Sequence, residues 1–289
     1  MMTINNSIIK MQSFNTNRKD ITIQSDKKKK GGKCLLCKEF TDFYRCELST
    51  NSVYICNECA RALQSYSFEG FNLQHGTQTN DDITIGCELE TIGNSLDAKV
   101  YLIKYGFIPT ADCTVDIEYK SPIYNNLSSL SKVAGMIEQL DKNQNIDFSV
   151  NNIHCGLHTH FGYKNKDIQN YILPFYKELF NPLNDLIDSL TDTQKKAIFG
   201  STYRHYAQSI NTDRPLKHEN WINIQHNKTI EIRLFRFNDA NQYIKGVKVF
   251  RAMLSILFDE LEMLDTFTAK RIGEKMVKKF TKEYADIIG

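Results

Sequence analysis

The sequence predicts an α+β fold built on a largely antiparallel sheet, and three observations lead to this prediction. Segments with alternating apolar and polar residues occur singly or as a hairpin among helical segments, rather than in a regular strand–helix repeat. Two long amphipathic segments close the chain and offer apolar stripes for packing. The chain contains neither an internal repeat nor a glycine-rich phosphate loop of the GxxxxGK(S/T) type.

Length and composition are those of a soluble globular protein. The chain has 289 residues, of which 41% are hydrophobic and 24% charged, enough for one large domain or one medium domain with an appendage. Its net charge of only +2 does not favour nucleic acid or an anionic membrane surface as a partner. No apolar run is long enough to span a bilayer or to form the core of a secretory signal, so we expect a cytoplasmic protein with reduced cysteines.

We expect four regions along the chain. Residues 1–32 are rich in Asn, Ser, Thr and Lys and end in a lysine run and two glycines, which predicts a weakly ordered segment. Residues 33–67 carry two cysteine pairs and predict a zinc-binding module, and residues 68–82 predict a linker. Residues 83–289 then form the main, catalytic domain.

In the main domain, alternating segments predict strands, and segments with helical periodicity predict helices. The predicted strands cover residues 83–91, 114–120, 153–162, 220–226 and 229–237. The predicted helices cover residues 127–142, 166–190, 193–209, 241–263 and 268–286. The last two helices are the long amphipathic segments.

The cysteines of the N-terminal module have the spacing of a structural zinc site. Cys34 and Cys37 form one CxxC pair, Cys56 and Cys59 form another, and eighteen residues separate the two pairs. Zinc prefers four tetrahedral ligands, and two CxxC turns supply four thiolates and leave no open coordination position. Because the module is too short to bury a useful core, bound zinc would supply much of its folding free energy. Free or redox-active thiols are the alternative, and Cys46 could replace one of the four ligands.

The first predicted strand of the main domain separates apolar from acidic residues. Within residues 83–91, apolar side chains alternate with Gly86, Glu88 and Glu90, so the two carboxylates lie on one face of the strand. Two carboxylates one strand repeat apart repel each other, and a bound divalent cation would remove this conflict. The glycine beside them leaves room for a substrate to approach the backbone.

Three further strands repeat this layout, each with one apolar side and one side that carries charged residues or histidines. The polar sides hold Thr114, Asp116, Glu118 and Lys120 on the second strand, His154, His158 and His160 on the third, and Glu231 and Arg233 on the fifth. Four such strands favour a sheet that buries one face under helices and lines the other with metal ligands and cationic groups. For any single strand, an amphipathic surface strand is the alternative.

Phosphoryl transfer is the chemistry that these residue types suit. Carboxylates hold Mg²⁺ through oxygen ligands, the ion bridges nucleotide phosphates, and arginines neutralise the charge of the transferring group. His158 and His160 could bind zinc, or one could contact magnesium or the nucleotide while the other is hydrogen-bonded. The cationic candidates are Lys120, Arg204, Arg214, Arg233 and Arg236.

Five segments of the main domain resemble the amidoligase family, which is grouped with glutamine synthetase and the glutamate–cysteine ligases. Residues 86–90 resemble the GxExE opening strand of that family, and residues 112–122 resemble its D-x-S…E-x-x-S-P segment. Residues 155–161 (CGLHTHF) closely resemble its C-G-x-H-x-H strand, and residues 203–206 fit its arginine-bearing segment. Residues 231–236 (EIRLFR) resemble its closing E-x-R-x-F strand.

This resemblance implies a curved antiparallel sheet with helices on its outer face and an ATP site on its inner face, as in glutamine synthetase. It also implies an ATP-dependent ligase that activates a carboxylate as an acyl phosphate and joins it to an amine. Glu88, Glu90 and Glu118 would hold magnesium. His158 or His160 would complete the metal or nucleotide site.

The resemblance also assigns roles to the arginines and to the last carboxylate. Arg204 and Arg233 would contact the phosphates or the transition state, and Glu231 would bind a further metal or orient the amine. Ser121 and Pro122 would shape a loop beside the substrate. The expected catalytic residues are thus Glu118, Glu231, Arg204 and Arg233. The acid and the amine could belong to small molecules, peptides or proteins, and the zinc module could recruit a protein partner.

Two other functions fit parts of the sequence. A zinc-dependent hydrolase could use His158 and His160 with Glu118 or Glu231, and would work without ATP. A zinc-module interaction protein with an inactive enzyme domain is the other alternative, and the intact acidic and arginine residues argue against it. The near-neutral charge of the chain also argues against strong nucleic-acid binding.

Overall fold

The computed structural model describes four N-terminal strands and most of the main domain. The described residues are 9–11, 21–29, 43–48, 51–56, 82–93, 98, 102, 107–110, 115, 117–121, 123–124, 126–143, 149–150, 155–202, 207–210, 215–217 and 219–289. The chain divides into two compact units. Unit 1 consists of Met1–His75, Glu88–Ile123 and Met136–Cys155, and unit 2 consists of Gly76–Cys87, Tyr124–Gly135 and Gly156–Gly289.

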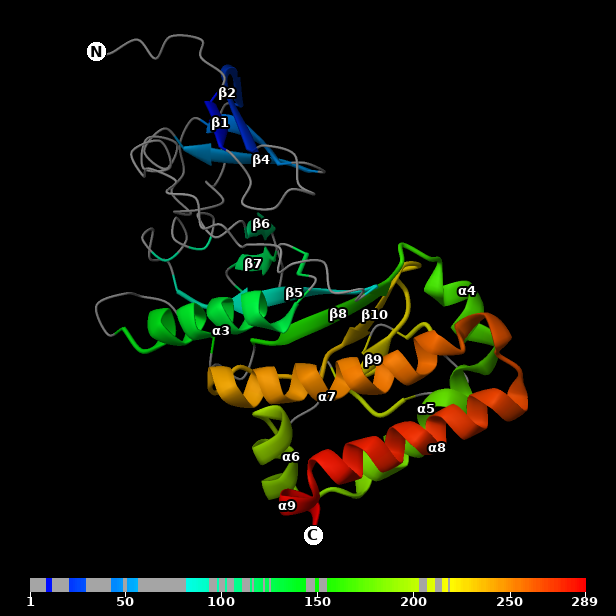
Figure 1. The fold of residues 1–289 in the computed structure, drawn as a ribbon. Helices are drawn as coiled ribbons and strands as arrows, with labels where there is room; N and C mark the ends of the chain where they lie inside the picture. The colour runs from blue at the N-terminus through cyan, green and yellow to red at the C-terminus, as the bar shows by residue number, and fades with distance from the viewer. Residues whose placement is uncertain are drawn as a thin grey trace. The chain divides into compact units, whose positions relative to one another are not determined.

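The first strands of unit 1 form an antiparallel sheet of their own. β1 (Ile9–Met11), β2 (Ile21–Lys29), β3 (Phe43–Leu48) and β4 (Asn51–Cys56) pair in the order β1-β2-β3-β4 (Figure 1). β-Branched and aromatic residues recur in these strands, as expected for residues that fit a pleated sheet. β1 and β2 lie within residues 1–32, where the sequence predicted weak order.

A second set of strands in unit 1 carries the acidic residues. β6 (Ile108–Thr110) pairs antiparallel with β7 (Ile117–Lys120), and β7 pairs antiparallel with the C-terminal half of β5 (Ile83–Thr91). Leu89 and Ile117 are fully buried, so one side of these strands faces a core. Strand β5 has the bounds that the sequence predicted.

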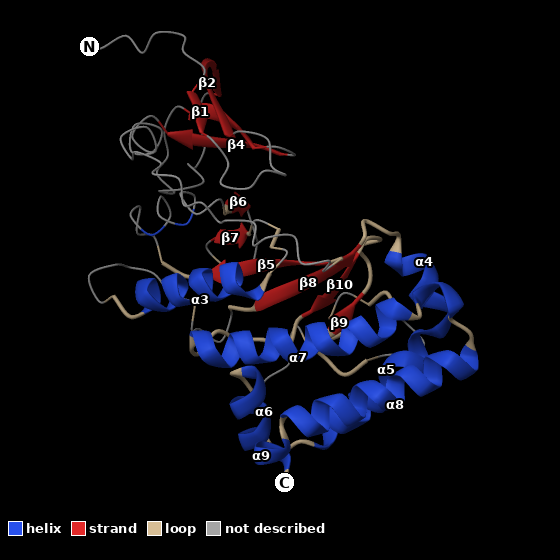
Figure 2. Ribbon diagram, viewed as in Figure 1, coloured by secondary structure: helices blue, strands red, loops and turns tan. Residues whose placement is uncertain are grey.

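In unit 2 the strand order is β5-β8-β10-β9. β8 (Leu157–Tyr163) pairs antiparallel with β10 (Thr229–Ile232), and β10 pairs antiparallel with β9 (Ile222–Asn223). The combination of antiparallel sheet and helices in Figure 2 confirms the predicted mixture of α and β structure.

The helices follow the predicted segments but are shorter and more often interrupted. They are α3 (Leu127–Asp141), α4 (Ile168–Ile172), the 3-10 helix η1 (Leu173–Phe175), α5 (Tyr176–Ser189), α6 (Asp192–Phe199), α7 (Ala240–Asp259), the 3-10 helix η2 (Leu261–Met263), α8 (Thr266–Glu283) and α9 (Ala285–Ile288). Among the residues placed by the structure, no helix combines the length and the apolar character that a membrane crossing requires.

The predicted helix at residues 193–209 ends at Phe199, and Gly200 explains the difference. Gly200 has a φ of 81°, in the left-handed region that favours glycine at a helix C-terminus. A Cβ at this position would lie 2.3 Å from the carbonyl oxygen of Arg236. The chain therefore leaves the helix here, and the amide of Arg236 donates to the carbonyl of Phe199.

Helix α7 covers the apolar face of β8 in unit 2. Tyr243 on α7 bonds to Thr159 on β8 through their hydroxyl groups, 3.0 Å apart. Phe235 packs edge-to-face against both Tyr243 and Phe250, and such aromatic pairs contribute about 0.5–1.5 kcal/mol each beyond their buried area. Because successive strand residues point to opposite faces, the histidines of β8 lie on the side away from α7.

Candidate functional site

Glu231 is the centre of a buried polar group whose members lie on β8, on β9, on β10 and directly after β10. Its Oε1 accepts a hydrogen bond from Arg233 Nη1 at 2.7 Å and lies 3.3 Å from His158 Nδ1. Its Oε2 accepts a hydrogen bond from Asn223 Nδ2 at 2.9 Å. We call these four residues the Glu231 group. Glu231 is 1% exposed, and an ionised carboxylate is buried this deeply only when charged groups or hydrogen bonds compensate for the lost water.

Strand pairing brings the members of the Glu231 group together. Glu231 lies opposite His160 on β8 and opposite Asn223 on β9. On β8, Leu157, Thr159 and Phe161 are fully buried, and His158 and His160 alternate with them. The pleat of β8 therefore places both histidines on the face toward which Glu231 points.

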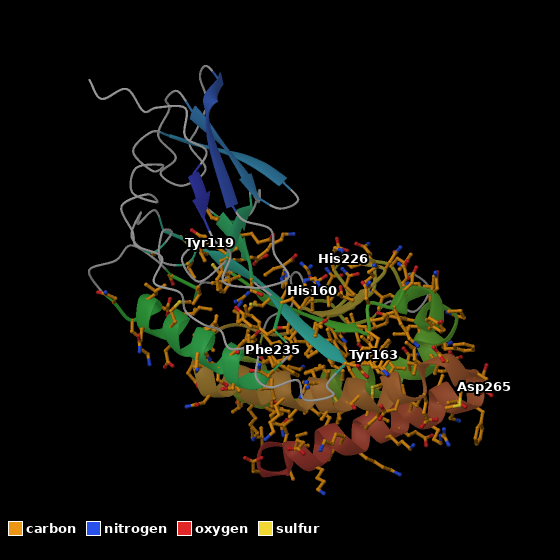
Figure 3. All side chains as sticks on the ribbon, turned by 45° about the horizontal axis from the view of Figure 1, so that its top comes forward. Tyr119, His160, Tyr163, His226, Phe235 and Asp265 are labelled. Carbon is orange, nitrogen blue, oxygen red and sulfur yellow. The ribbon has the colours of Figure 1, made fainter. Side chains whose placement is uncertain are left out.

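His160 has a second neighbourhood near the turn between β9 and β10. Its Nδ1 lies 3.3 Å from Thr229 Oγ1, and its ring meets the exposed ring of His226 edge-to-face at a centroid distance of 5.4 Å (Figure 3). The amide of Thr229 donates to the carbonyl of His226, which closes the turn. The turn thus brings a third imidazole to the face of β8 that carries His158 and His160, and imidazole nitrogens can bind metals or polar ligand atoms.

Glu88, Glu90 and Glu118 in unit 1 form an acidic group on β5 and β7. Glu90 lies directly opposite Glu118, and Glu88 lies opposite Lys120. Lys120 Nζ lies 3.0 Å from Glu88 Oε1 and 3.5 Å from Glu118 Oε1. Partial burial by itself would lower the pKa of Lys120, but the attraction and hydrogen bonds of Glu88 and Glu118 outweigh it and raise that pKa above its usual value.

The acidic group has the chemistry of a site for a divalent cation. It offers carboxylate oxygens, which are the donors that Mg²⁺ prefers. Three carboxylates and the single ammonium of Lys120 leave these four side chains with an excess of negative charge. The side chains of Glu88 and Glu118 are 16% and 13% exposed, while that of Lys120 is 46% exposed. The two carboxylates are thus partly open to solvent, and the lysine that pairs with them is nearly half exposed.

Gly86 precedes the acidic residues on β5 and belongs to unit 2. Among the atoms of the described residues, none lies within 4 Å of the position that a Cβ on Gly86 would take. This open space agrees with the prediction that the glycine leaves room above the strand.

Several predicted site residues lie outside the described residues, and their roles stay predictions. These are Cys34, Cys37, Cys59, Asp116, Pro122, His154, Arg204 and Arg214. Cys56 is the last residue of β4. Ser121 is buried, and Arg236 is half-buried and linked to Phe199 through its backbone amide.

Three polar residues near the site were not predicted from the sequence: Asn223, His226 and Thr229. Asn223 was visible as the polar residue between Ile222 and Ile224 in a predicted strand. The alternation does not predict that Asn223 is buried, because its burial depends on pairing with β10, and the alternation does not show this pairing. His226 and Thr229 lie at the ends of a turn, where polar residues are usual and give no signal of their own.

Each of the two groups contains side-chain types that enzymes use in phosphoryl transfer. The acidic group can bind a divalent cation, and the Glu231 group holds a guanidinium and an imidazole in fixed positions. A family model described as "Putative amidoligase enzyme" matches residues 96–250, which is 155 of the 289 residues. The matched segment contains Glu118, all of the Glu231 group and most of α7. A search of curated proteins gave no match.

Proposed function

The chain belongs to the amidoligase family of amide-forming ligases, and from this premise we propose that it joins a carboxylate to an amine at the expense of ATP, with Mg²⁺ as cofactor. The observation that carries the proposal is the buried contact of Arg233 and His158 with Glu231 inside the matched segment. A fixed guanidinium in a water-poor site is the kind of group that stabilises charge on a transferring phosphoryl group.

The proposed reaction has two steps. In the first, the substrate carboxylate attacks the γ-phosphorus of ATP, and an acyl phosphate and ADP form. In the second, the amine attacks the acyl carbon, phosphate leaves with the C–O bonding electrons, and the amine loses a proton as the amide forms.

In this proposal, Glu88, Glu90 and Glu118 hold the magnesium ion. When bound, magnesium would neutralise part of the negative charge of the nucleotide phosphates. The donor set of the acidic group supports this assignment, because it combines oxygen donors with partial burial and an excess of negative charge. We also propose that the side chain of Lys120 leaves Glu88 and Glu118 when the ion binds.

Arg233 would bind a phosphoryl oxygen while it keeps its bond to Glu231. The hydrogen bond from its Nη1 to Glu231 Oε1 holds the guanidinium in position for this contact. His160 would contact the nucleotide or complete the metal site, and Arg204 would supply a second cation for the phosphates. The buried position of Glu231 supports a role in orienting Arg233 and His158 during both steps.

Mass spectrometry of the purified protein with Mg-ATP and a mixture of acids and amines tests the proposal. We expect a product whose mass equals acid plus amine minus water, together with ADP and phosphate. Glu88→Gln should abolish the product. Glu138→Gln should not, because Glu138 is a helix carboxylate that pairs with Lys142 outside the acidic group.

Other outcomes of this experiment would replace the proposal. Release of ADP without an amide product would indicate a kinase or ATPase. Cleavage of a substrate without ATP, lost in EDTA and in His158→Ala, would favour the zinc-dependent hydrolase.

We further propose that the N-terminal CxxC pairs bind a structural zinc ion and that this module contacts a protein partner. The β3–β4 hairpin supports the zinc proposal, since it returns the chain so that Cys56 lies opposite Phe43. Cys37 precedes Phe43 by six residues, a segment that spans at most about 20 Å, so the two pairs are within reach of each other. Elemental analysis should find one zinc per chain, and Cys34→Ser should lose it. Absence of zinc from protein purified without chelators would overturn the proposal.

A further inference from the structure

Asn223 is the one member of the Glu231 group to which the proposed reaction gives no role. It is fully buried at the end of β9, opposite Glu231 on β10. Its Nδ2 donates to Glu231 Oε2 at 2.9 Å, and its Oδ1 accepts from the backbone amide of Gln225 at 2.8 Å. Both ends of the amide are therefore held, one by the carboxylate and the other by the backbone of the following turn.

We propose that Asn223 is a positioning residue: it fixes the plane of the Glu231 carboxylate so that Glu231 can hold Arg233 and His158 at the reacting phosphates. This inference rests on the proposed function. Arg233 and His158 both approach Oε1, so their contacts act on one side of the carboxylate. The terminal torsion of a glutamate is broad, and a donor on Oε2 restricts the rotation that contacts at Oε1 leave open.

The chemistry of an amide suits this task better than that of a charged donor. Asn223 satisfies Oε2 without adding a positive charge, so the negative charge of Glu231 acts on Arg233 and His158. A lysine or arginine at this position would compete with both of them. Loss of the amide would leave a buried carboxylate oxygen without its donor, which favours rotation of Glu231 toward other donors. This rotation weakens the hold on Arg233.

Asn220 provides a matched control on the same segment. It is also fully buried and lies three residues earlier, but its Nδ2 donates to the carbonyl of Pro215 at 3.4 Å. Asn220→Ala therefore removes an equally buried amide that serves a neighbouring turn. If Asn223 only stabilised the fold and had no positioning role, Asn223→Ala and Asn220→Ala would differ in the free energy of unfolding alone.

The first experiment is free of any ligand and uses a double-mutant cycle in urea. Asn223→Ala and Arg233→Lys are measured singly and together. We expect the combined shift of the urea midpoint to be smaller than the sum of the single shifts, because each change already loosens Glu231. The cycle of Asn220→Ala with Arg233→Lys should be additive. Additive shifts in the Asn223 cycle would overturn the inference.

The second experiment measures nucleotide binding and ADP release. Trp221 is the single tryptophan of the chain, is fully buried, and its carbonyl accepts from the amide of Arg233, so its fluorescence should report Mg-ATP binding. Asn223→Ala should lower kcat by about 10- to 100-fold with little change in Kd, as expected when a supporting contact is lost. Asn223→Asp should lose at least as much, because it sets a second carboxylate against Glu231.

The two experiments separate failure of the inference from failure of the proposed function. Equal kcat values for Asn223→Ala and Asn220→Ala would overturn the positioning role. If the wild-type protein neither binds Mg-ATP nor releases ADP, the proposed function fails. The urea cycle then still decides whether Asn223 acts on Arg233 through Glu231.

Discussion

The two acidic regions of this protein place carboxylates in opposite surroundings. Glu231 is 1% exposed, and both of its oxygens contact nitrogen donors from the Glu231 group. Glu88 and Glu118 are more exposed and share a lysine that is nearly half exposed, and Glu118 lies directly opposite Glu90 on the neighbouring strand. Carboxylates of the same chemical type are therefore fixed in one region and adjustable in the other.

This difference separates two functions of acidic residues in a sheet. A buried carboxylate with three nitrogen neighbours has its charge committed to its partners, so it orients them. A partly exposed group of several carboxylates offers oxygen donors to an added ion. Sequence alternation alone gives both regions the same description, and only register and burial separate them.

The largest loss of stability is expected when Arg233 is removed from the Glu231 group. Arg233→Met leaves Glu231 buried without its cation, so we expect the free energy of unfolding to fall by about 3–5 kcal/mol. Urea denaturation followed by circular dichroism measures the change. Lys142→Met is the control, because its pair with Glu138 is exposed and should contribute no more than about 0.5 kcal/mol. A loss below about 1 kcal/mol in Arg233→Met would contradict the fixed, ion-paired description of Glu231.

Removal of a carboxylate from the second region should weaken cation binding. Glu118→Gln should lower the affinity for Mg²⁺ or Mn²⁺ at least tenfold, which corresponds to about 1.4 kcal/mol. Isothermal titration calorimetry with Mg²⁺ or electron paramagnetic resonance with Mn²⁺ measures this affinity. Glu138→Gln should leave the affinity unchanged. If Glu118→Gln binds the ion as tightly as wild type, the acidic group is a salt-bridge cluster and does not bind the ion.

The sequence predicted the faces of the strands better than their contacts. Alternation in residues 83–91 gave β5 with its correct bounds, and helical periodicity in residues 127–142 gave α3 to within one residue. The helix expected at residues 193–209 failed after Phe199, because the close approach of Gly200 to the backbone of Arg236 is a tertiary contact. Local periodicity carries no information about such a contact.

The same limit applies to the candidate site. The alternation of His158, Thr159 and His160 placed both histidines on one face, as the burial of β8 requires. The register of β10 with β8 and β9 determines which residues lie beside the two oxygens of Glu231. The local sequence pattern does not show this register. Asn223 was missed for this reason.

Two buried tyrosines allow a finer comparison of the regions. Tyr243 in unit 2 bonds to Thr159, whereas the hydroxyl of Tyr119 in unit 1 has no hydrogen-bond partner among the described residues. Tyr243→Phe should therefore cost about 1 kcal/mol of unfolding free energy at pH 7, and Tyr119→Phe should be neutral or slightly stabilising. Chemical denaturation at pH 7 measures the free energy of unfolding of Tyr243→Phe and of Tyr119→Phe. Equal losses in both variants would contradict the assigned contacts.

The alkaline limb of stability provides a second test of these tyrosines. Burial raises the pKa of both Tyr119 and Tyr243 above 10, so the folded protein keeps protons that the unfolded chain releases near pH 10. The free energy of unfolding should then fall as pH rises above 10, and each Phe substitution should make that fall less steep. Urea midpoints measured between about pH 8 and 11, a range that includes the usual tyrosine pKa, give the dependence of stability on pH. If neither Phe variant changes this dependence, the raised pKa values of Tyr119 and Tyr243 are contradicted.

The smallest effect belongs to Lys120 and depends on whether the ion is present. In EDTA, Lys120→Met removes the cation that Glu88 and Glu118 share, and we expect a loss of only about 0.5 kcal/mol, because the lysine is nearly half exposed and solvent screens its charge. Since these carboxylates raise the pKa of Lys120, the stabilisation should be complete below the usual lysine pKa and disappear as pH rises through the raised value.

Magnesium should reverse the effect of Lys120→Met. The ion takes over neutralisation of the acidic group, and without the lysine it meets no competing cation, so the variant should gain more thermal stability from Mg²⁺ than wild type does. Thermal unfolding in EDTA and in excess Mg²⁺ measures both states, with Lys142→Met as the variant that loses a lysine elsewhere in unit 1. An equal loss for Lys120→Met in both buffers would mean that the lysine acts by packing alone. A greater loss in Mg²⁺ would mean that lysine and ion bind side by side, so that the adjustable region holds two cations rather than exchanging them.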